Sequence, residues 1–132
     1  MNEFEEMMQL LYGRGEVMQG SSMTDEEARA FGNKHFAMFQ YCLVRDWAWI
    51  DLEVTEAEMA GLQQYSRKPA LILAQSVIYD SARRWDVGNF VRTSPLVKFD
   101  QGCLFTTTST VYILLGEGRR TRAKLETVGR IF

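Results

Sequence analysis

The stretch over residues 70–116 constrains the fold of this chain more than any other part of the sequence. Runs of apolar, β-branched and aromatic residues alternate there with short groups of Asp, Gly, Ser and Pro. This alternation is typical of successive antiparallel strands joined by turns. It predicts strands over residues 70–79, 89–99, 103–107 and 111–115, of which the last two form a hairpin. The first strand opens with an almost unbroken apolar run, which indicates a central position with both faces covered. Pro95 cannot donate a hydrogen bond to a neighbouring strand and marks an edge or a bulge.

Two threonines mark the starts of the main helices. Thr24 and Thr55 are each followed three residues later by a glutamate, Glu27 or Glu58, which is the spacing of a capping box. With apolar residues at helical spacing near the N-terminus, these signals predict helices over residues 3–12, 24–39 and 55–64. Gly32 lies near the apolar stripe of the second helix and would allow close packing there.

Between residues 40 and 54 the apolar residues recur at every second position, which predicts two strands, 41–45 and 48–54. A tight turn at Asp46 and Trp47 would join them, and the alternative is a bulge in one long strand. In the second strand, alternation places Ala48, Ile50 and Leu52 on one face. Trp49, Asp51 and Glu53 share the other face.

Together these elements predict one α+β domain over residues 1–132. Its core would be a single antiparallel sheet of about five to six strands, with the two main helices packed on one side. A chain of 132 residues that is 46% apolar is able to bury one core of this kind. After Gly116 a basic segment is expected to leave the sheet and enter a short helical tail ending at residues 131–132.

The two cysteines and the N-terminal sequence bear on the compartment. Cys42 and Cys103 each lie inside an apolar run, which favours buried free thiols in a reducing environment over a disulfide. The acidic N-terminus lacks the basic region and cleavage site of a signal peptide. The apolar runs are shorter than the ~20 residues that a membrane span needs. We therefore expect a cytoplasmic protein with no membrane partner.

The sequence contains no clear pattern of catalytic residues or metal ligands. His35 is the single histidine and lies on the apolar stripe of a predicted helix, which favours a packed histidine over a general base or metal ligand. Cysteine and histidine do not occur at zinc-ligand spacing, and no glycine pattern matches a phosphate-binding loop. No catalytic residue, metal or cofactor is therefore predicted, and a small enzyme using His35 with a thiol or carboxylate remains an alternative.

Charge is distributed unevenly along the chain. Residues 1–66 carry 12 acidic and 4 basic residues, whereas residues 67–132 carry 5 acidic and 11 basic ones. Such halves predict a dipolar surface, unless they interleave in space and their fields cancel. The basic residues form a candidate nucleic-acid site, namely Arg83, Arg84, Arg119, Arg120, Arg122 and Lys124. The pI near 5.4 favours the other interpretation, in which solvated loops oppose the acids of the first half.

An aromatic and acidic group forms a candidate protein interface: Trp47, Trp49, Asp51 and Glu53. If Ile50 faces the core, Trp49 faces away from it, beside Asp51 and Glu53. An outward tryptophan in such a setting is a suitable interface anchor. The alternative is that a helix covers this face as well.

Four segments carry a resemblance to a known group of proteins: VRDWAWIDL (44–52), RTSPL (92–96), GCLF (102–105) and TVYILLG (110–116). Together they resemble a family of small uncharacterised proteins, a domain of unknown function, found in proteobacterial genomes and their prophages. The resemblance implies a mobile-element setting and a protein that binds and blocks host machinery. It implies no active-site residues.

We therefore expect a non-enzymatic protein–protein interaction protein, encoded by a phage or other mobile element, that inhibits a host defence complex. A nucleic-acid-binding module and a small enzyme remain the alternatives. A homodimer is also expected, because a sheet with an unfilled edge or face commonly pairs with its own copy.

Overall fold

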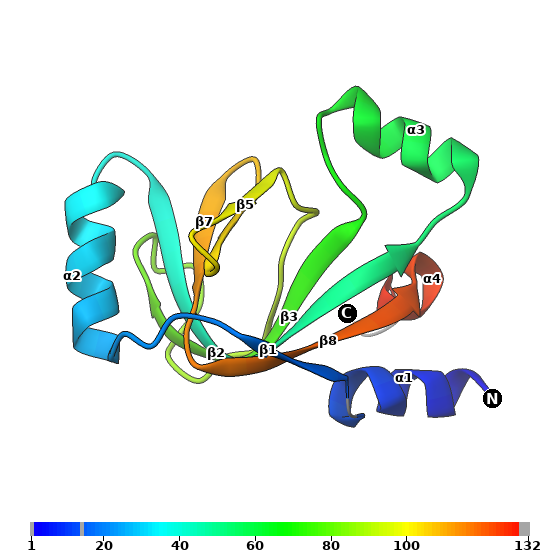
Figure 1. The fold of residues 1–132 in the computed structure, drawn as a ribbon, viewed down its shortest axis with the longest axis horizontal. Helices are drawn as coiled ribbons and strands as arrows, with labels where there is room; N and C mark the ends of the chain where they lie inside the picture. The colour runs from blue at the N-terminus through cyan, green and yellow to red at the C-terminus, as the bar shows by residue number, and fades with distance from the viewer. Residues whose placement is uncertain (1, 14, 130–132) are drawn as a thin grey trace.

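A computed structural model describes residues 2–13 and 15–129 of the chain. Within these residues the fold is α+β, with four helices and a curled, mixed sheet of eight strands (Figure 1). The helices are α1 (Glu3–Tyr12), α2 (Asp25–His35), α3 (Glu56–Gln64) and α4 (Leu125–Gly129). The strands are β1 (Glu16–Gln19), β2 (Gln40–Glu53), β3 (Ala70–Asp80), β4 (Val91–Arg92), β5 (Lys98–Asp100), β6 (Leu104–Thr106), β7 (Thr110–Leu114) and β8 (Glu117–Lys124).

Strand β2 is the central element of the sheet. On one side it pairs antiparallel with β3 along most of its length. On the other side its first part pairs with β7 and its second part with β8, and both of these pairings are parallel. The expectation of a purely antiparallel sheet is therefore wrong. Parallel neighbouring strands need a long crossover connection, and the chain between β2 and β7 is long enough to provide one. The alternation of apolar and polar residues within a strand does not indicate which strands pair with it or in which direction.

The predicted tight turn between residues 45 and 48 is also wrong. The chain passes through Asp46 and Trp47 as one continuous strand, with a local kink at Asp46, where φ is 51°. On the neighbouring side, Gly116 with φ of 71° separates β7 from β8. Because β3 runs beside β2 across the kink, the hydrogen bonds of the sheet hold the two parts of β2 in one strand.

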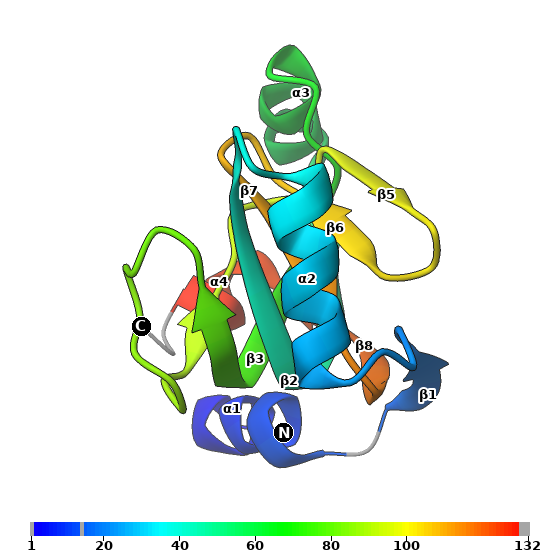
Figure 2. The ribbon, with the colours of Figure 1, turned by 90° about the vertical axis from the view of Figure 1, so that its left-hand side faces the viewer.

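The predicted strand over residues 89–99 divides into β4 and β5, which lie on either side of Pro95. The segment between them links both edges of the sheet. Leu96 donates its backbone N–H to Ala70 of β3 at 2.9 Å, and Val97 donates to Thr106 of β6 at 2.8 Å. The sheet therefore curls upon itself (Figures 1 and 2). The other strand predictions, 70–79 and the hairpin 103–107 with 111–115, are confirmed as β3, β6 and β7.

Hydrophobic residues pack on both faces of β2. Inside the curl lie Trp47 and Trp49, together with Phe105 of β6. On the opposite face, Ala48, Ile50 and Leu52 pack against Leu10 of α1 and Val128 of α4. A further cluster joins Tyr41 and Leu43 of β2 to Ala28 of α2. The predicted alternation of β2 is confirmed.

The two capping boxes are confirmed. The Oγ1 of Thr24 and of Thr55 accepts a hydrogen bond from the backbone N–H of the glutamate three residues later, and the carboxylate of that glutamate accepts one from the backbone N–H of the threonine. Helix α2 ends at His35, earlier than predicted, and packs on the sheet through Ala28 and Gly32. A Cβ added to Gly32 would lie 2.4 Å from the ring of Tyr41, which confirms close packing there.

Helix α3 differs from expectation because it contains no buried residue. The prediction of two helices packed on one side of the sheet is therefore wrong for α3, which projects from the sheet on two connecting segments (Figure 1). Its caps specify where the helix begins but not what it packs against.

The basic segment after Gly116 does not leave the sheet as expected. It forms β8, which inserts between β1 and β2, and α4 follows as the predicted short helix. The end of the tail, residues 131–132, lies outside the described residues. None of the helices in the described part of the chain has both the length and the apolar character needed to cross a membrane.

Candidate functional site

The two tryptophans of the predicted interface are core residues. Trp47 is 2% exposed and Trp49 is 5% exposed. Trp49 packs edge-to-face against Phe99 and Phe105, with ring centroids 4.9 and 5.1 Å away. The expectation that Trp49 faces outward is therefore wrong. The face of β2 that carries Trp49 is covered by the curled sheet and not by a helix. The covering residues, Phe99 and Phe105, lie about fifty positions after Trp49 in the sequence.

Asp51 joins Trp49 to a basic residue of the neighbouring strand. It accepts hydrogen bonds from Trp49 Nε1 at 3.2 Å and from Arg120 Nε and Nη2 at 2.7 and 2.9 Å. The Arg120 guanidinium also lies 5.1 Å from the Trp49 ring centroid. Burial acts to raise the pKa of Asp51, but the hydrogen bonds from Arg120 and Trp49 outweigh it and hold the pKa below its usual range. The contacts among Trp49, Asp51 and Arg120 therefore connect β2 to β8. Glu53 is exposed and pairs in register with Lys124 of β8.

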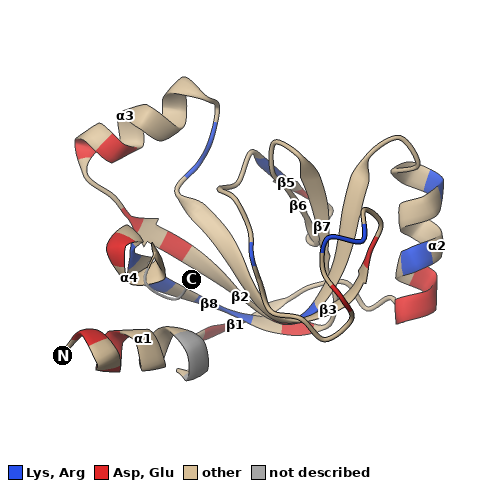
Figure 3. Cartoon of the chain, turned by 180° about the vertical axis from the view of Figure 1, so that it is seen from behind, with Lys and Arg blue, Asp and Glu red and all other residues tan. Residues whose placement is uncertain are grey.

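The basic residues of β8 lie on two different faces. Arg119 donates a hydrogen bond to the backbone carbonyl of Leu10 in α1, and its burial lowers its pKa. Strand alternation places Arg120, Arg122 and Lys124 on the opposite face, next to β2. Because β8 lies between the acid-bearing strands β1 and β2, opposite charges alternate there (Figure 3). The acidic and basic halves of the sequence thus interleave in this region.

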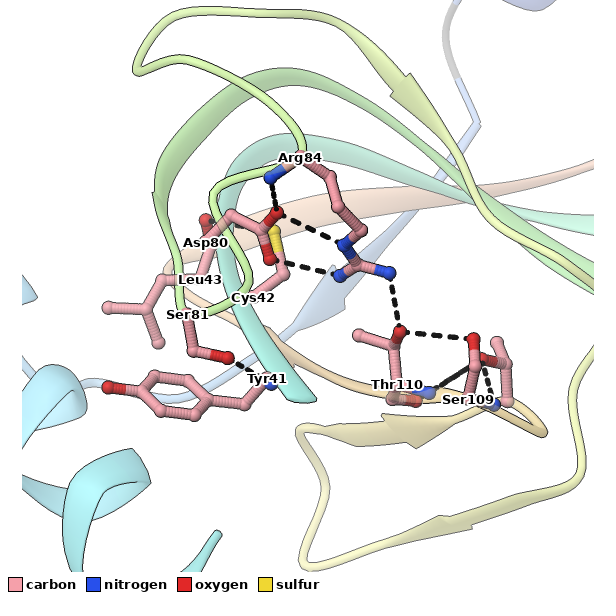
Figure 4. Close-up of polar contacts among 9 residues, drawn as sticks. Tyr41, Cys42, Leu43, Asp80, Ser81, Arg84, Ser109 and Thr110 are labelled. Carbon is pink, nitrogen blue, oxygen red and sulfur yellow. Dashed lines mark hydrogen bonds and ion pairs between the residues drawn. The ribbon is translucent and has the colours of Figure 1, made fainter. Parts of the chain in front are cut away.

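Arg84 lies elsewhere and is held by a buried carboxylate (Figure 4). The Asp80 side chain is fully buried and accepts from the backbone N–H of Arg84 at 2.7 Å, from Nε at 3.1 Å and from Nη2 at 2.9 Å. Arg84 Nη1 donates to Thr110 Oγ1 at 2.8 Å, and the guanidinium stacks 4.3 Å from the Trp85 ring centroid. These contacts join the end of β3 to the start of β7. Arg83 occupies the same loop with φ of 54°.

The groups proposed for the enzyme alternative lie in different surroundings. Cys42 belongs to the core inside the curl, where burial, followed by the nearby Asp80 carboxylate, raises the pKa of its thiol to about 12. His35 lies on α2 and is exposed, so the expectation of a histidine packed in the core is wrong, although its ring centroid lies 4.4 Å from that of Phe31. The described residues contain no group of three or more His, Cys, Asp and Glu side chains able to hold a metal ion.

A groove of about 620 Å³ lies between α2 and the β5–β6 hairpin. We call it the aromatic groove. Its lining combines four rings from the end of α2 and the segment after it with residues of β5, β6 and β7: Phe31, His35, Phe36, Phe39, Lys98, Asp100, Gln101, Leu104, Thr106 and Val111. Of these residues Phe39 is 57% exposed, and Met38, which precedes it in the chain, is 96% exposed. The sequence analysis missed this site, although three phenylalanines within nine residues of one helix end are a signal for it.

Helix α2, which borders the aromatic groove, and helix α3 lie toward opposite ends of the long axis of the molecule, with β5 between them (Figure 1). Figure 2, turned by 90°, shows α3 at the top, above α2 and the β5–β6 hairpin. We call the aromatic groove, together with the exposed side chains of Met38 and Phe39, the docking end.

A family model, Domain of unknown function (DUF6957), matches residues 19–130. The chain belongs to the DUF6957 family. The matched range includes every candidate site residue named above, and it leaves α1 outside the family domain. No curated protein and no solved structure shows a significant match to the chain.

Proposed function

We propose that this member of the DUF6957 family is a non-enzymatic protein–protein interaction protein whose contact surface is the docking end. The observation that carries the proposal is the exposure of Met38 and Phe39 beside a groove lined by Phe31 and Phe36. Fully burying one large apolar side chain contributes roughly 1.5–3 kcal/mol. A partner that covers these residues would gain this free energy. Apolar side chains around a concave site are typical of surfaces that bind proteins.

The candidate sites elsewhere support this choice of surface. Trp47 and Trp49 are already buried, Asp51 holds Arg120, and Asp80 holds Arg84. These groups stabilise the fold through contacts that a partner would have to break. The docking end offers apolar side chains that are exposed, namely Met38 and Phe39.

The finer proposal concerns the partner and rests on the resemblance to proteins of proteobacterial genomes and prophages. We propose that the protein is encoded by a mobile element and acts in the cytoplasm. Its partner would be a host defence complex, which the protein inhibits by covering one surface of that complex.

A photocrosslinking amino acid placed in the full chain tests the surface inside a proteobacterial host. One variant carries it at Met38 and the matched control carries it at Val87, which is 75% exposed but lies in the loop after β3. The proposal expects a discrete crosslinked protein from position 38 and not from position 87. The variant Phe39→Asp should abolish that crosslink. Equal crosslinking from both positions, or none from either, would contradict the proposal.

A further inference from the structure

Helix α1 covers the face of the sheet that lies outside the curl, and it does so through a small contact (Figures 1 and 2). Of its residues 3–10, Leu10 alone is buried, at 3% exposure, and it packs against β2, β3 and α4. Phe4 is 68% exposed. Glu6 accepts a hydrogen bond of 3.3 Å from Thr127 Oγ1 of α4. Over these eight residues α1 therefore contributes a single buried apolar side chain to the core.

The space beside Leu10 is not filled by side chains. One pocket of about 270 Å³ lies among Leu10, Ala48 and Leu73, and another of about 260 Å³ lies among Leu10, Thr121 and Ala123. Close packing is what gives a buried apolar contact its full stabilisation, because each gap removes dispersion contacts. The docking of α1 therefore gains less from packing than that of a closely packed helix.

Arg119 of β8 opposes the docking of α1. Its guanidinium donates a hydrogen bond to the backbone carbonyl of Leu10. Its Nη1 is buried, however, without an acceptor among the described residues, and none of these residues forms an ion pair with the side chain. Burial lowers the pKa of Arg119, which means that its charged form is destabilised there. A guanidinium withdrawn from water without a carboxylate loses more free energy than a hydrogen bond to a neutral carbonyl restores.

We infer that α1 is a reversible cover, which detaches while the sheet stays folded and so exposes the apolar face beneath Leu10 and returns Arg119 to water. A detached segment of ten residues is too short to remain helical in water, so α1 detaches and unfolds in one step. Local openings of this kind require less free energy than global unfolding. The face that becomes exposed comprises Ala48, Ile50, Leu52, Leu71 and Leu73.

The extent of the family domain agrees with this division of the chain. The family model begins at residue 19, so α1 precedes the matched region, whereas β2, β3 and their apolar face lie inside it. The inference does not depend on the proposed function, because the docking end is built from the end of α2 with β5, β6 and β7.

Thiol labelling at two buried isoleucines tests the opening. Ile50 and Ile72 lie on neighbouring strands and both are 0% exposed, but Ile50 packs in the cluster of Leu10 and Ile72 lies inside the curl. Ile50→Cys should react with a thiol reagent about tenfold or more faster than Ile72→Cys, because detachment of α1 uncovers only position 50. Peptide mass spectrometry assigns the label and separates it from the native Cys42 and Cys103.

Two further substitutions, each made in the Ile50→Cys chain, identify the forces on α1. Arg119→Met keeps a long side chain and removes the charge, so it should slow labelling at position 50 about tenfold. Leu10→Ala weakens the docking and should accelerate labelling about tenfold or more. Lys34→Met is the matched control, because it removes an exposed cation on α2, and it should leave the rate unchanged.

Hydrogen exchange with mass spectrometry provides a second measurement on chains without introduced thiols. In the wild type the amides of residues 3–10 should exchange faster than those of β2. The same amides should exchange about tenfold more slowly in Arg119→Met, and at the wild-type rate in Lys34→Met. Circular dichroism verifies that each variant is folded.

Each outcome decides for or against the cover. Equal labelling at positions 50 and 72 would mean that the face opens only when the whole domain unfolds, and this would overturn the inference. Unchanged or faster labelling and exchange in Arg119→Met would show that Arg119 anchors α1, which also overturns it. Faster labelling at position 50, slowed by Arg119→Met and accelerated by Leu10→Ala, supports the inference.

Discussion

The indole Nε1–H of Trp47 donates a hydrogen bond of 3.1 Å to the backbone carbonyl of Leu115. This bond ties the kink of β2 at Asp46 to the junction of β7 and β8 at Gly116, the two points where the central strands bend. The ring of Trp47 then lies directly against Gly118, where an added Cβ would be 2.3 Å from a ring atom. One buried tryptophan therefore sets how closely β2 and β8 approach.

The substitution Gly118→Ala should destabilise the protein by about 1–3 kcal/mol, because the added methyl group meets a ring that is fixed in the core. Gly129→Ala is the matched control, since a Cβ there meets nothing within 4 Å. Urea unfolding of the two variants checks the prediction. Wild-type stability in Gly118→Ala would show that the ring can move aside.

Two helical glycines should respond to the same change in opposite directions. Gly32→Ala places a Cβ 2.4 Å from the ring of Tyr41 and should lower the free energy of unfolding by about 1–3 kcal/mol. Gly61→Ala on α3 meets nothing within 4 Å and should raise helix content, because alanine favours the helix by up to about 1 kcal/mol. Thermal unfolding and circular dichroism measure both. Equal losses of stability would mean that α3 is packed.

Acid should destabilise the fold partly through Asp80. Burial acts to raise the pKa of Asp80, but the hydrogen bonds and charge of Arg84 hold it below its usual value near 3.9. The unfolded chain then binds the proton more tightly, so this contribution is present above about pH 4 and is lost as the pH falls through the folded-state pKa.

Asp80→Asn should be less stable than the wild type at pH 7 and should lose less stability between about pH 4 and pH 2. Urea unfolding across this range provides the measurement. Asp51, whose pKa is also lowered, keeps part of the acid dependence in the variant. An unchanged slope in Asp80→Asn would contradict the prediction.

The thiol of Cys42 should be inert in the folded protein. Burial and the Asp80 carboxylate raise its pKa to about 12, so only about one molecule in ten thousand carries the thiolate at pH 8. Burial also raises the pKa of Cys103. A thiol-reactive disulfide reagent at pH 8 should therefore label the native chain far more slowly than the chain in denaturant. Rapid labelling without denaturant would indicate an accessible thiolate.

The parts of the fold that follow from neighbouring residues could be predicted. The starts of α2 and α3 follow from Thr24 and Thr55 because a cap bonds a backbone group only three residues away. The hairpin of β6 and β7 likewise joins segments that are adjacent in sequence. The buried start of β3 follows from its continuous apolar run.

The candidate site could be predicted only in part. Trp49 has the sequence neighbours of an exposed residue, and its burial depends on Phe99 and Phe105, which reach it because the sheet curls. The aromatic groove forms because Phe31 of α2 lies over the face of the sheet that carries Leu104 and Val111. No local pattern relates residues that far apart.

The sequence by itself determined where α2 and α3 begin, where β3, β6 and β7 run and which residues of β2 share a face. Tertiary structure alone decided that β2 lies parallel to β7 and β8, that Arg120 meets Asp51 and that α3 stands clear of the core. The physical reason is that a helix cap is a hydrogen bond between residues three positions apart, and the alternation of side chains along a strand repeats every two residues. Strand partners and covered faces depend instead on which distant apolar surfaces the whole chain buries together.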